Sequence, residues 1–331
     1  MAKTMMVCSG GGHLKQLYSL ADRLGVAPED QVWITFENGL STSLLADREV
    51  HYTSFVAPRD LRNLWRLRSL AAKVLDLHEY DRAFSTGSSP AVAVLPMAAR
   101  RGAAAHYIES AARALGPSVS GRILQGINGV RTYTQYPSWR NARWRYAGSI
   151  YDGFVRADAQ AAAASAAVAP KTPPPSRAVG RLRRAVVTVG TQEGYGFSRL
   201  FDAVVPLLAD CDDVLWQTGP QDVSRWGIEG RDRVPHDELN AAVREADVVI
   251  AHAGTGSAIT AFEQGKFPVL VPRLARYGEH VDDHQIQIAR EMERRGLAFM
   301  QMPEELDEGV LHEASVREVR TVEAPPLHLA A

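Results

Sequence analysis

Short apolar runs recur along the chain, and each ends in a turn of small or polar residues that a helical pattern follows. Strands that are apolar at every position are typical of parallel sheets covered on both faces, and their alternation with helices predicts an α/β protein. The expected strands lie at 4–8, 31–36, 104–108, 130–135, 145–148, 185–189, 214–217, 248–250 and 267–271, with one more beginning at Asp81. The expected helices lie at 14–24, 58–77, 91–100, 197–208, 239–246, 257–264 and 285–295.

The length of 331 residues allows two domains, each with its own hydrophobic core. An Ala-rich and Pro-rich stretch at 158–178 predicts an extended linker between a first domain, 1–157, and a second domain, 179–302. The charged, Pro-containing tail at 303–331 is expected to be partly disordered.

Composition indicates a globular protein, because 46% of the residues are hydrophobic and 23% are charged. The sequence has no apolar run of about 18 residues and no signal-peptide pattern. Its two cysteines, Cys8 and Cys211, lie in different halves, so we expect a reducing, cytoplasmic compartment. Residues 1–160 hold 19 Lys and Arg against 13 Asp and Glu, which favours either solvated surface charge or contact with acidic lipid. No nucleic acid partner is expected.

The most informative segment is 246–272, where an apolar strand runs into His252-Ala253-Gly254-Thr255-Gly256-Ser257 and then a helix. The first turn of a helix has unpaired N–H groups and a partial positive charge, so it attracts anions. Ser257 is expected to cap this helix, and Glu263 lies about 9 Å further along the axis. That spacing suits a diphosphate at the helix start and a ribose beyond it. The alternative is an ordinary strand, turn and helix without a ligand.

A second glycine turn, Ser9-Gly10-Gly11-Gly12-His13, follows the first strand. His13 is a candidate general base because its ordinary pKa lies near neutrality, and the alternative is a histidine that only caps the helix. Glu109 ends another strand, where ligands of open α/β sheets bind, so it is a second candidate base. Its alternative role is an ion pair with Arg113.

The basic amphipathic helix at 58–77 carries Trp65 and suits a membrane surface, but its leucines could equally pack against the domain. The loop at 273–285 ends in Asp282, Asp283, His284 and Gln285, which could bind sugar hydroxyls or phosphate. His280, Asp282 and His284 could suggest a metal. The arginines of the loop favour an anion instead, so no metal is expected.

The second half resembles the C-terminal domain of glycosyltransferase family 28, in VVTVGT at 186–191, the 246–272 segment and DDHQIQIA at 282–289. The first half resembles the partner subunit of the two-subunit oligosaccharide GlcNAc transferase and its exopolysaccharide counterparts. The matching motifs there are SGGGH at 9–13, APRD at 57–60, STGSSPAV at 85–92, YIESAAR at 107–113 and YAGSIYD at 146–152. The chain therefore looks like a fusion of the two subunits.

This resemblance implies a GT-B fold, with two Rossmann-like domains whose parallel sheets face a central cleft. It implies an inverting hexosyl- or N-acetylhexosaminyltransferase that uses a UDP-sugar and a polyprenyl-diphosphate-linked acceptor, in exopolysaccharide or cell-envelope glycan synthesis. No metal or other cofactor is implied. The partner subunit usually has an N-terminal membrane anchor that this sequence lacks, so membrane contact at the inner face would fall to residues 59–77.

The sequence thus predicts His13 or Glu109 as the base and a set of ligand-binding residues. These are Gly11, Gly12, Gly190, Thr191, Gln217, Thr218, Gly219, His252, Gly254, Thr255, Gly256, Ser257, Glu263, His284 and Gln285. Among them, Gln217, Thr218 and Gly219 are expected to line the uracil pocket, and His284 and Gln285 to contact the sugar. The alternatives to a transferase are a UDP-sugar epimerase of the same architecture and a non-catalytic binding subunit.

Overall fold

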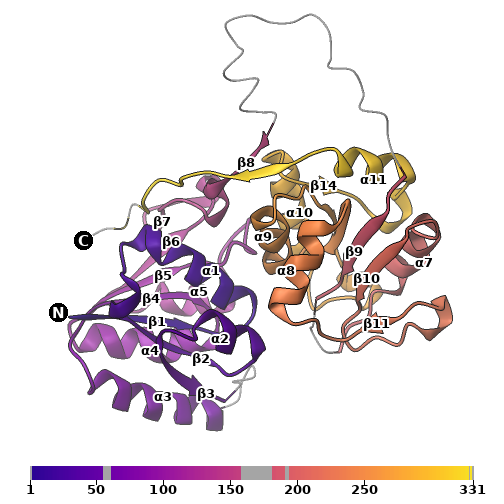
Figure 1. The fold of residues 1–331 in the computed structure, drawn as a ribbon. Helices are drawn as coiled ribbons and strands as arrows, with labels where there is room; N and C mark the ends of the chain where they lie inside the picture. The colour runs from indigo at the N-terminus through magenta and orange to yellow at the C-terminus, as the bar shows by residue number, and fades with distance from the viewer. Residues whose placement is uncertain (1, 55–60, 158–180, 191–193, 328, 330–331) are drawn as a thin grey trace, which may run out of the picture. The chain divides into compact units, whose positions relative to one another are not determined.

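The computed structural model describes all residues except 1, 55–60, 158–180, 191–193, 328 and 330–331. These residues form two compact units (Figure 1): unit 1 comprises 1–152 and 324–331, and unit 2 comprises 153–323. The predicted linker, 158–178, lies outside the described residues.

Unit 1 is built on a seven-stranded sheet of parallel strands in the order β3-β2-β1-β4-β5-β6-β7. The strands are β1 (Lys3–Cys8), β2 (Gln31–Phe36), β3 (Glu49–Thr53), β4 (Tyr80–Gly87), β5 (Ala104–Ile108), β6 (Val130–Thr134) and β7 (Trp144–Tyr146). The central strands are buried at nearly every position, as the apolar runs predict. β3 is partly exposed and was not predicted.

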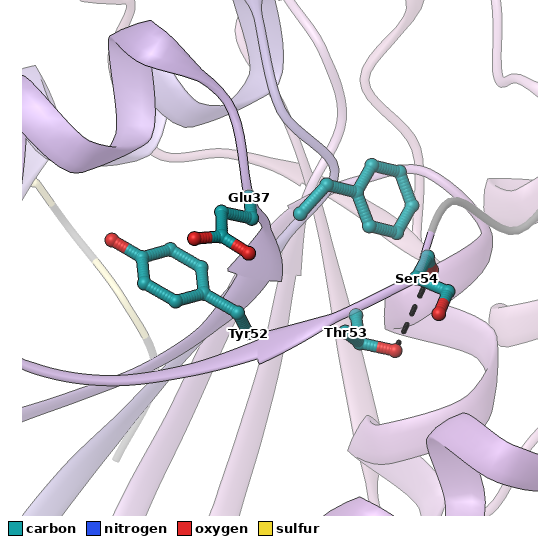
Figure 2. A pocket seen from close by; sticks show the side chains of 5 residues that line it. Glu37, Tyr52, Thr53 and Ser54 are labelled. Carbon is teal, nitrogen blue, oxygen red and sulfur yellow. Dashed lines mark hydrogen bonds between the residues drawn. The ribbon is translucent and has the colours of Figure 1, made fainter.

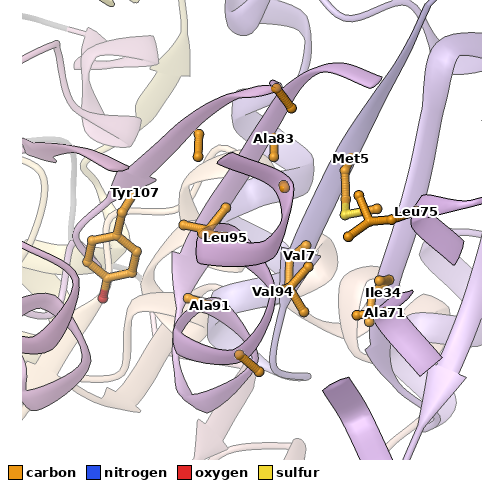
Figure 3. Close-up of a cluster of buried hydrophobic side chains, with 14 of the residues drawn as sticks. Met5, Val7, Ile34, Ala71, Leu75, Ala83, Ala91, Val94, Leu95 and Tyr107 are labelled. Atoms are coloured by element: carbon orange, nitrogen blue, oxygen red, sulfur yellow. The ribbon is translucent and has the colours of Figure 1, made fainter. Parts of the chain in front are cut away.

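The helices of unit 1 cover both faces of this sheet. They are α1 (Gly12–Leu20), α2 (Gly39–Leu44), α3 (Leu61–Leu75), α4 (Ser89–Arg100) and α5 (Val119–Leu124), with 3-10 turns η1 (Asp22–Leu24), η2 (Pro28–Asp30), η3 (Pro137–Trp139) and η4 (Ile150–Gly153). α3 and α4 pack on the face that presents Met5, Val7 and Ile34 (Figure 3). α1 covers the other face, where the Tyr18 ring lies 6.4 Å from that of Trp33.

Cys8 is fully buried at the end of β1, and burial raises its pKa to about 12. Cys8 and Cys211 are both free cysteines. None of the described helices combines the length and apolar character that a membrane crossing needs.

Unit 2 has a six-stranded parallel sheet in the order β11-β10-β9-β12-β13-β14 and a two-stranded antiparallel sheet, β15-β8. The strands are β8 (Phe154–Arg156), β9 (Arg184–Thr188), β10 (Asp213–Gln217), β11 (Gly230–Arg231), β12 (Val248–His252), β13 (Val269–Val271), β14 (Phe299–Met300) and β15 (Val319–Thr321). The helices and 3-10 turns are α7 (Ser198–Leu207), α8 (His236–Glu245), α9 (Thr255–Glu263), α10 (His284–Arg294), α11 (Glu308–Ser315), η5 (Ser224–Trp226), η6 (Ala275–Tyr277) and η7 (Pro303–Glu305).

The expectation of a partly disordered tail is wrong for most of its length, because the tail contains α11 and β15. The Asp307 side chain caps α11 by accepting a hydrogen bond of 2.8 Å from the Val310 N–H, and Leu311 is fully buried. β15 then pairs with β8, which lies more than 160 residues earlier in the chain.

Each large sheet reverses its strand order at one point, between β1 and β4 in unit 1 and between β9 and β12 in unit 2. Connections leave the two strands in opposite directions at such a switch point, which opens a crevice at their carboxyl ends where ligands of doubly wound folds bind. The two glycine turns predicted from sequence follow β1 and β12. Both therefore lie at a switch point.

Candidate functional site

The switch point of unit 2 brings Gly190, which follows β9, against His252 at the end of β12. Gly190 has a φ of +74°, and a Cβ atom there would lie 2.7 Å from the imidazole ring. Only glycine therefore fits this turn. Gly219, after β10, lies beside it, since its Cβ position would be 3.1 Å from the Gly190 carbonyl oxygen. Thr191 is outside the described residues.

The helix after β12 begins earlier than predicted. α9 runs from Thr255 to Glu263 with Gly254 as its N-cap, so the prediction that Ser257 caps it is wrong. Gly254 has no side chain that could occupy the helix end, which leaves the N–H groups of Thr255, Gly256 and Ser257 directed outward from the first turn. Thr255 is 6% exposed, and its Oγ1 has no hydrogen-bond partner among the described residues. This end of α9 is therefore suited to an anion.

Glu263 is exposed at the last position of α9. It lies seven residues after Gly256, which places both on one face of the helix about 10 Å apart. Thr260 lies between them on that face and is 6% exposed. A ligand along this face of α9 would therefore extend from Gly256, rather than from Ser257, to Glu263. Thr260 lies on the same face between them, and the sequence analysis missed it.

Gln217 and Thr218 are buried, and their side chains bond within the protein. Gln217 Oε1 accepts a hydrogen bond of 2.5 Å from Thr188 Oγ1, and Thr218 Oγ1 donates to the Gly219 carbonyl at 3.0 Å. These bonds fix the turn after β10. The expected contact of these residues with uracil stays a prediction.

The loop after β13 contains a buried cation that the sequence analysis did not single out. Arg273 is 2% exposed, and its Nη2 donates to the Val189 carbonyl at 2.7 Å. Gln285 Oε1 accepts from the Arg273 backbone N–H at 3.0 Å, so Gln285 positions this arginine from a buried site. Burial lowers the pKa of the guanidinium to about 10, which leaves it charged at neutral pH.

Three histidines surround this region. Burial, followed by the positive charge of Arg273, lowers the pKa of His252 to about 3. Burial and then the nearby His284 lower the pKa of His280 to about 4. His284 Nδ1 hydrogen-bonds to Asp282 Oδ1, which orients its ring.

His280, Asp282 and His284 each offer one ligand atom, and these atoms lie within 4.8 Å of one another. Such a set could hold a metal ion. The buried Arg273 charge that acts on His280 opposes a cation at this place. The absence of a metal stays a prediction.

In unit 1, His13 is held at the switch point by both neighbouring strands. It is the second residue of α1, whose N-cap is Gly11, so the alternative that His13 only caps the helix is wrong. Its Nδ1 lies 2.7 Å from the Thr86 carbonyl oxygen, and Thr86 Oγ1 donates to the His13 carbonyl at 2.8 Å. A carbonyl can only accept, so Nδ1 carries the proton and Nε2 the lone pair. A general base needs this tautomer.

The turn before His13 is open. A Cβ atom on Gly11 or Gly12 would meet nothing within 4 Å, whereas one on Gly87 would lie 2.8 Å from the His13 ring. Gly87 therefore allows the ring to lie against β4, and the two turn glycines leave room for a ligand beside it.

Glu109 is 1% exposed, and both carboxylate oxygens are hydrogen-bonded. Oε1 accepts from Tyr107 Oη and the Ser110 N–H at 3.1 and 3.0 Å, and Oε2 accepts from the Ser118 N–H and Oγ at 2.8 and 3.0 Å. Burial raises its pKa despite these bonds. A carboxylate that is enclosed in this way typically has a structural role, here the connection of β5 to the start of α5. Its oxygens are already occupied by hydrogen bonds, which favours His13 as the base.

A cavity of about 300 Å³ lies at the carboxyl ends of β2 and β3 (Figure 2). It is lined by Phe36, Glu37, Tyr52, Thr53 and Ser54. Gly10 lies beside it, because a Cβ there would come within 3.8 Å of Phe36 Cβ. No sequence pattern marked this cavity, since its residues come from two strand ends without a shared motif.

α3 turns its apolar side to the sheet, with Leu67, Ala71 and Val74 buried. Its other side is basic and carries Trp65, which is 71% exposed. Packing against the domain is therefore confirmed for this helix, and contact with a membrane stays a prediction. Arg59 lies outside the described residues.

Residues 184–324 match the glycosyltransferase family 28 C-terminal domain. The matched residues make up most of unit 2, which is therefore similar to this domain. The matched residues include the α9 turn, Gly190 and Arg273 at the switch point of unit 2.

A curated relative of this chain is the UDP-N-acetylglucosamine transferase subunit ALG13 of Yarrowia lipolytica (strain CLIB 122 / E 150). The two are 42% identical over 59 residues, which is 18% of this chain. The matched region spans 28% of the length of that relative.

Solved structures match both units together. MurG of Acinetobacter baumannii is 18% identical with a TM-score of 0.55, and the match covers 94% of this chain and 89% of that one. The UDP-GlcNAc 2-epimerase of Methanocaldococcus jannaschii is 12% identical with a TM-score of 0.56, and the match covers 94% and 91%. These likenesses confirm the expected GT-B fold of two Rossmann-like domains.

Proposed function

We propose that the chain is an inverting glycosyltransferase that moves a sugar from a UDP-sugar to an acceptor hydroxyl. The observation that carries this proposal is the amino end of α9, where a glycine N-cap, outward N–H groups and the buried Thr255 hydroxyl form a place for a diphosphate. The family 28 match of unit 2 and the similarity of the chain to the UDP-N-acetylglucosamine transferase subunit ALG13 support a UDP-sugar as donor.

In the proposed reaction, the acceptor oxygen attacks the anomeric carbon and the bond from that carbon to the diphosphate oxygen breaks. His13 Nε2 takes the acceptor proton, and the diphosphate leaves as UDP. A single displacement of this kind inverts the anomeric centre. The helix dipole and the N–H groups of α9 then stabilise the charge that develops on the leaving group.

We further propose that the acceptor is a polyprenyl-diphosphate-linked sugar of exopolysaccharide or cell-envelope glycan synthesis, handled by unit 1. The open turn at Gly11 and Gly12 leaves space beside His13. The cavity next to it is lined by a carboxylate, a phenol and hydroxyls, groups that can hydrogen-bond to a sugar.

The test offers a panel of UDP-sugars with a membrane extract of the source organism and analyses the labelled lipid. Transfer to lipid from one donor supports the proposal, and no transfer from any donor contradicts it. A second arm supplies UDP-GlcNAc without acceptor. Conversion to another UDP-sugar there would favour the epimerase alternative.

Glu263→Ala is expected to weaken UDP binding by about 10-fold or more, because a carboxylate that accepts ribose hydroxyls contributes about 1.5–3 kcal/mol. Calorimetry with UDP measures the change. Glu293→Ala, in α10 of the same unit, is the control and should bind UDP as the wild type does. An unchanged affinity in Glu263→Ala would remove the ribose role.

Removal of divalent cations with EDTA is expected to leave turnover unchanged, since the helix dipole and side chains are proposed to neutralise the diphosphate. Metal analysis of the purified protein accompanies the assay. A loss of activity on chelation that Mg²⁺ or Zn²⁺ restores would contradict metal independence and direct attention to His280, Asp282 and His284.

We also propose that α3 places the protein at the inner, cytoplasmic face of the plasma membrane. Trp65→Ala is expected to reduce cosedimentation with vesicles that contain anionic lipid, because an exposed tryptophan next to arginines suits the headgroup region. Trp226→Ala, in unit 2, is the control. Equal binding by both variants and the wild type would exclude α3 as the contact.

A further inference from the structure

Arg273 is a buried cation with an unsatisfied donor. Its Nη2 donates a hydrogen bond to the Val189 carbonyl, but its buried Nε has no hydrogen-bond partner among the residues that the structure describes. Leaving a buried charged donor unpaired costs more free energy than leaving a neutral donor unpaired. A group of this kind in a folded protein is usually satisfied by an ordered water or by a ligand.

Among the described residues, no carboxylate forms an ion pair with the Arg273 guanidinium. The acidic group whose charge acts on it is Glu279. Glu279 already accepts two hydrogen bonds from Arg199, at 2.8 and 3.2 Å, and one from the Leu274 N–H at 3.0 Å. Arg199, which also pairs with the exposed Glu304 at 3.2 Å, thus holds the Glu279 carboxylate by direct hydrogen bonds that Arg273 does not make.

The position of this charge links it to the nucleotide site. Arg273 reaches the Val189 carbonyl, which precedes Gly190, and Gly190 lies against His252. His252 in turn precedes the N-cap of α9 by two residues and accepts a backbone hydrogen bond of 2.7 Å from the Gly254 N–H. The Arg273 guanidinium therefore lies at the same edge of the unit 2 sheet as the turns at Gly190 and Gly254 and the start of α9.

His252 and His280 do not add to the positive charge of Arg273 at neutral pH. His252 and His280 both have pKa values well below neutrality, in part because of Arg273 itself. At neutral pH this edge carries a fixed guanidinium beside neutral rings and the positive end of a helix. An anion fits this combination, and a second cation does not.

We propose that Arg273 binds the diphosphate of the nucleotide-sugar donor through Nε and stabilises the charge of the departing UDP. The inference rests on the proposed function and adds to it the residue that supplies a full positive charge. When the bond between the sugar and the diphosphate breaks, its electron pair stays on the diphosphate oxygen, and Arg273 offsets that charge.

The experiment compares UDP with uridine, which lacks the phosphates, on the wild type and on Arg273→Gln. Calorimetry measures UDP and ligand-detected NMR measures uridine. Arg273→Gln is expected to bind UDP about 10–100-fold more weakly while its affinity for uridine is unchanged, since charge-assisted hydrogen bonds contribute about 1.5–3 kcal/mol. Arg276→Gln, an exposed arginine of the same loop, should bind both as the wild type does.

Equal losses for UDP and uridine would show a structural role and overturn the inference, as would an unchanged UDP affinity. If Arg273→Gln does not fold, Arg273→Lys serves, because it keeps the charge but lacks the Nε fork. A UDP-to-uridine affinity ratio equal to that of the wild type in the Lys variant would also overturn it. Wild-type protein that binds neither ligand would contradict the proposed function itself, which separates the two failures.

Discussion

His13→Ala is expected to lower turnover about 10²–10⁴-fold, the usual contribution of a positioned general base. The Thr86 carbonyl fixes the tautomer in which Nε2 carries the lone pair, so the loss removes a preorganised proton acceptor. UDP binding should not change, because the proposed diphosphate site lies in unit 2. Transfer of labelled sugar to lipid measures turnover, and calorimetry measures the affinity for UDP.

Glu109→Gln is the informative comparison for this result. The amide of the glutamine would place an NH₂ group where the N–H groups of Ser118 or Ser110 now donate to the carboxylate. The variant should therefore have a lower thermal stability, while the fraction that folds should keep most of its turnover. A large loss of turnover in Glu109→Gln at unchanged stability would make Glu109 the base. Full activity in both variants would remove both candidates.

The apolar runs predicted the sheets well where strands are buried on both sides. β1, β2 and β5 carry this signal because helices cover both faces. β3 does not, because it lies at the sheet edge and its residues Glu49–Thr53 are exposed or half-buried. The pairing of β15 with β8 depends on contacts between distant segments, which no local pattern records.

Part of the site could be predicted, because a glycine turn between a buried strand and a helix lets a ligand approach the backbone at the helix start. The turns at Gly11 and Gly254 lie at the two switch points, as doubly wound folds require. Arg273 was not predictable as a site residue. An arginine in a polar loop is usually exposed, and only the structure reveals its burial and an Nε that has no partner among the described residues.

Helix starts were less predictable than helix positions. Ser257 is a good N-cap residue by type, yet α9 begins at Thr255 after a glycine cap. The glycine is required for another reason, since a Cβ on Gly254 would lie 2.3 Å from His252 Nε2. Close packing at the switch point therefore overrode the local capping preference.

Acidification from about pH 6.5 to pH 3 is expected to destabilise unit 2 through His252, whose ordinary pKa of 6.5 falls to about 3 in the folded state. Between these values the unfolded chain binds a proton that the folded unit does not, so stability is complete above pH 6.5 and declines as the pH falls. The loss attributable to His252 is on the order of 3 kcal/mol at pH 4, from about 1.4 kcal/mol per pKa unit.

Hydrogen exchange of the β12 amides at pH 7 and pH 4, corrected for intrinsic rates, measures this loss. His252→Gln should reduce the difference between the two pH values, because a neutral amide takes up no proton at this place. His312→Gln, which removes a histidine of α11, should keep the full difference. His280, also buried beside Arg273, acts in the same direction, so the double variant at positions 252 and 280 should be the least sensitive to acid. An acid sensitivity in His252→Gln equal to that of the wild type would mean that the imidazole is not held neutral at the switch point.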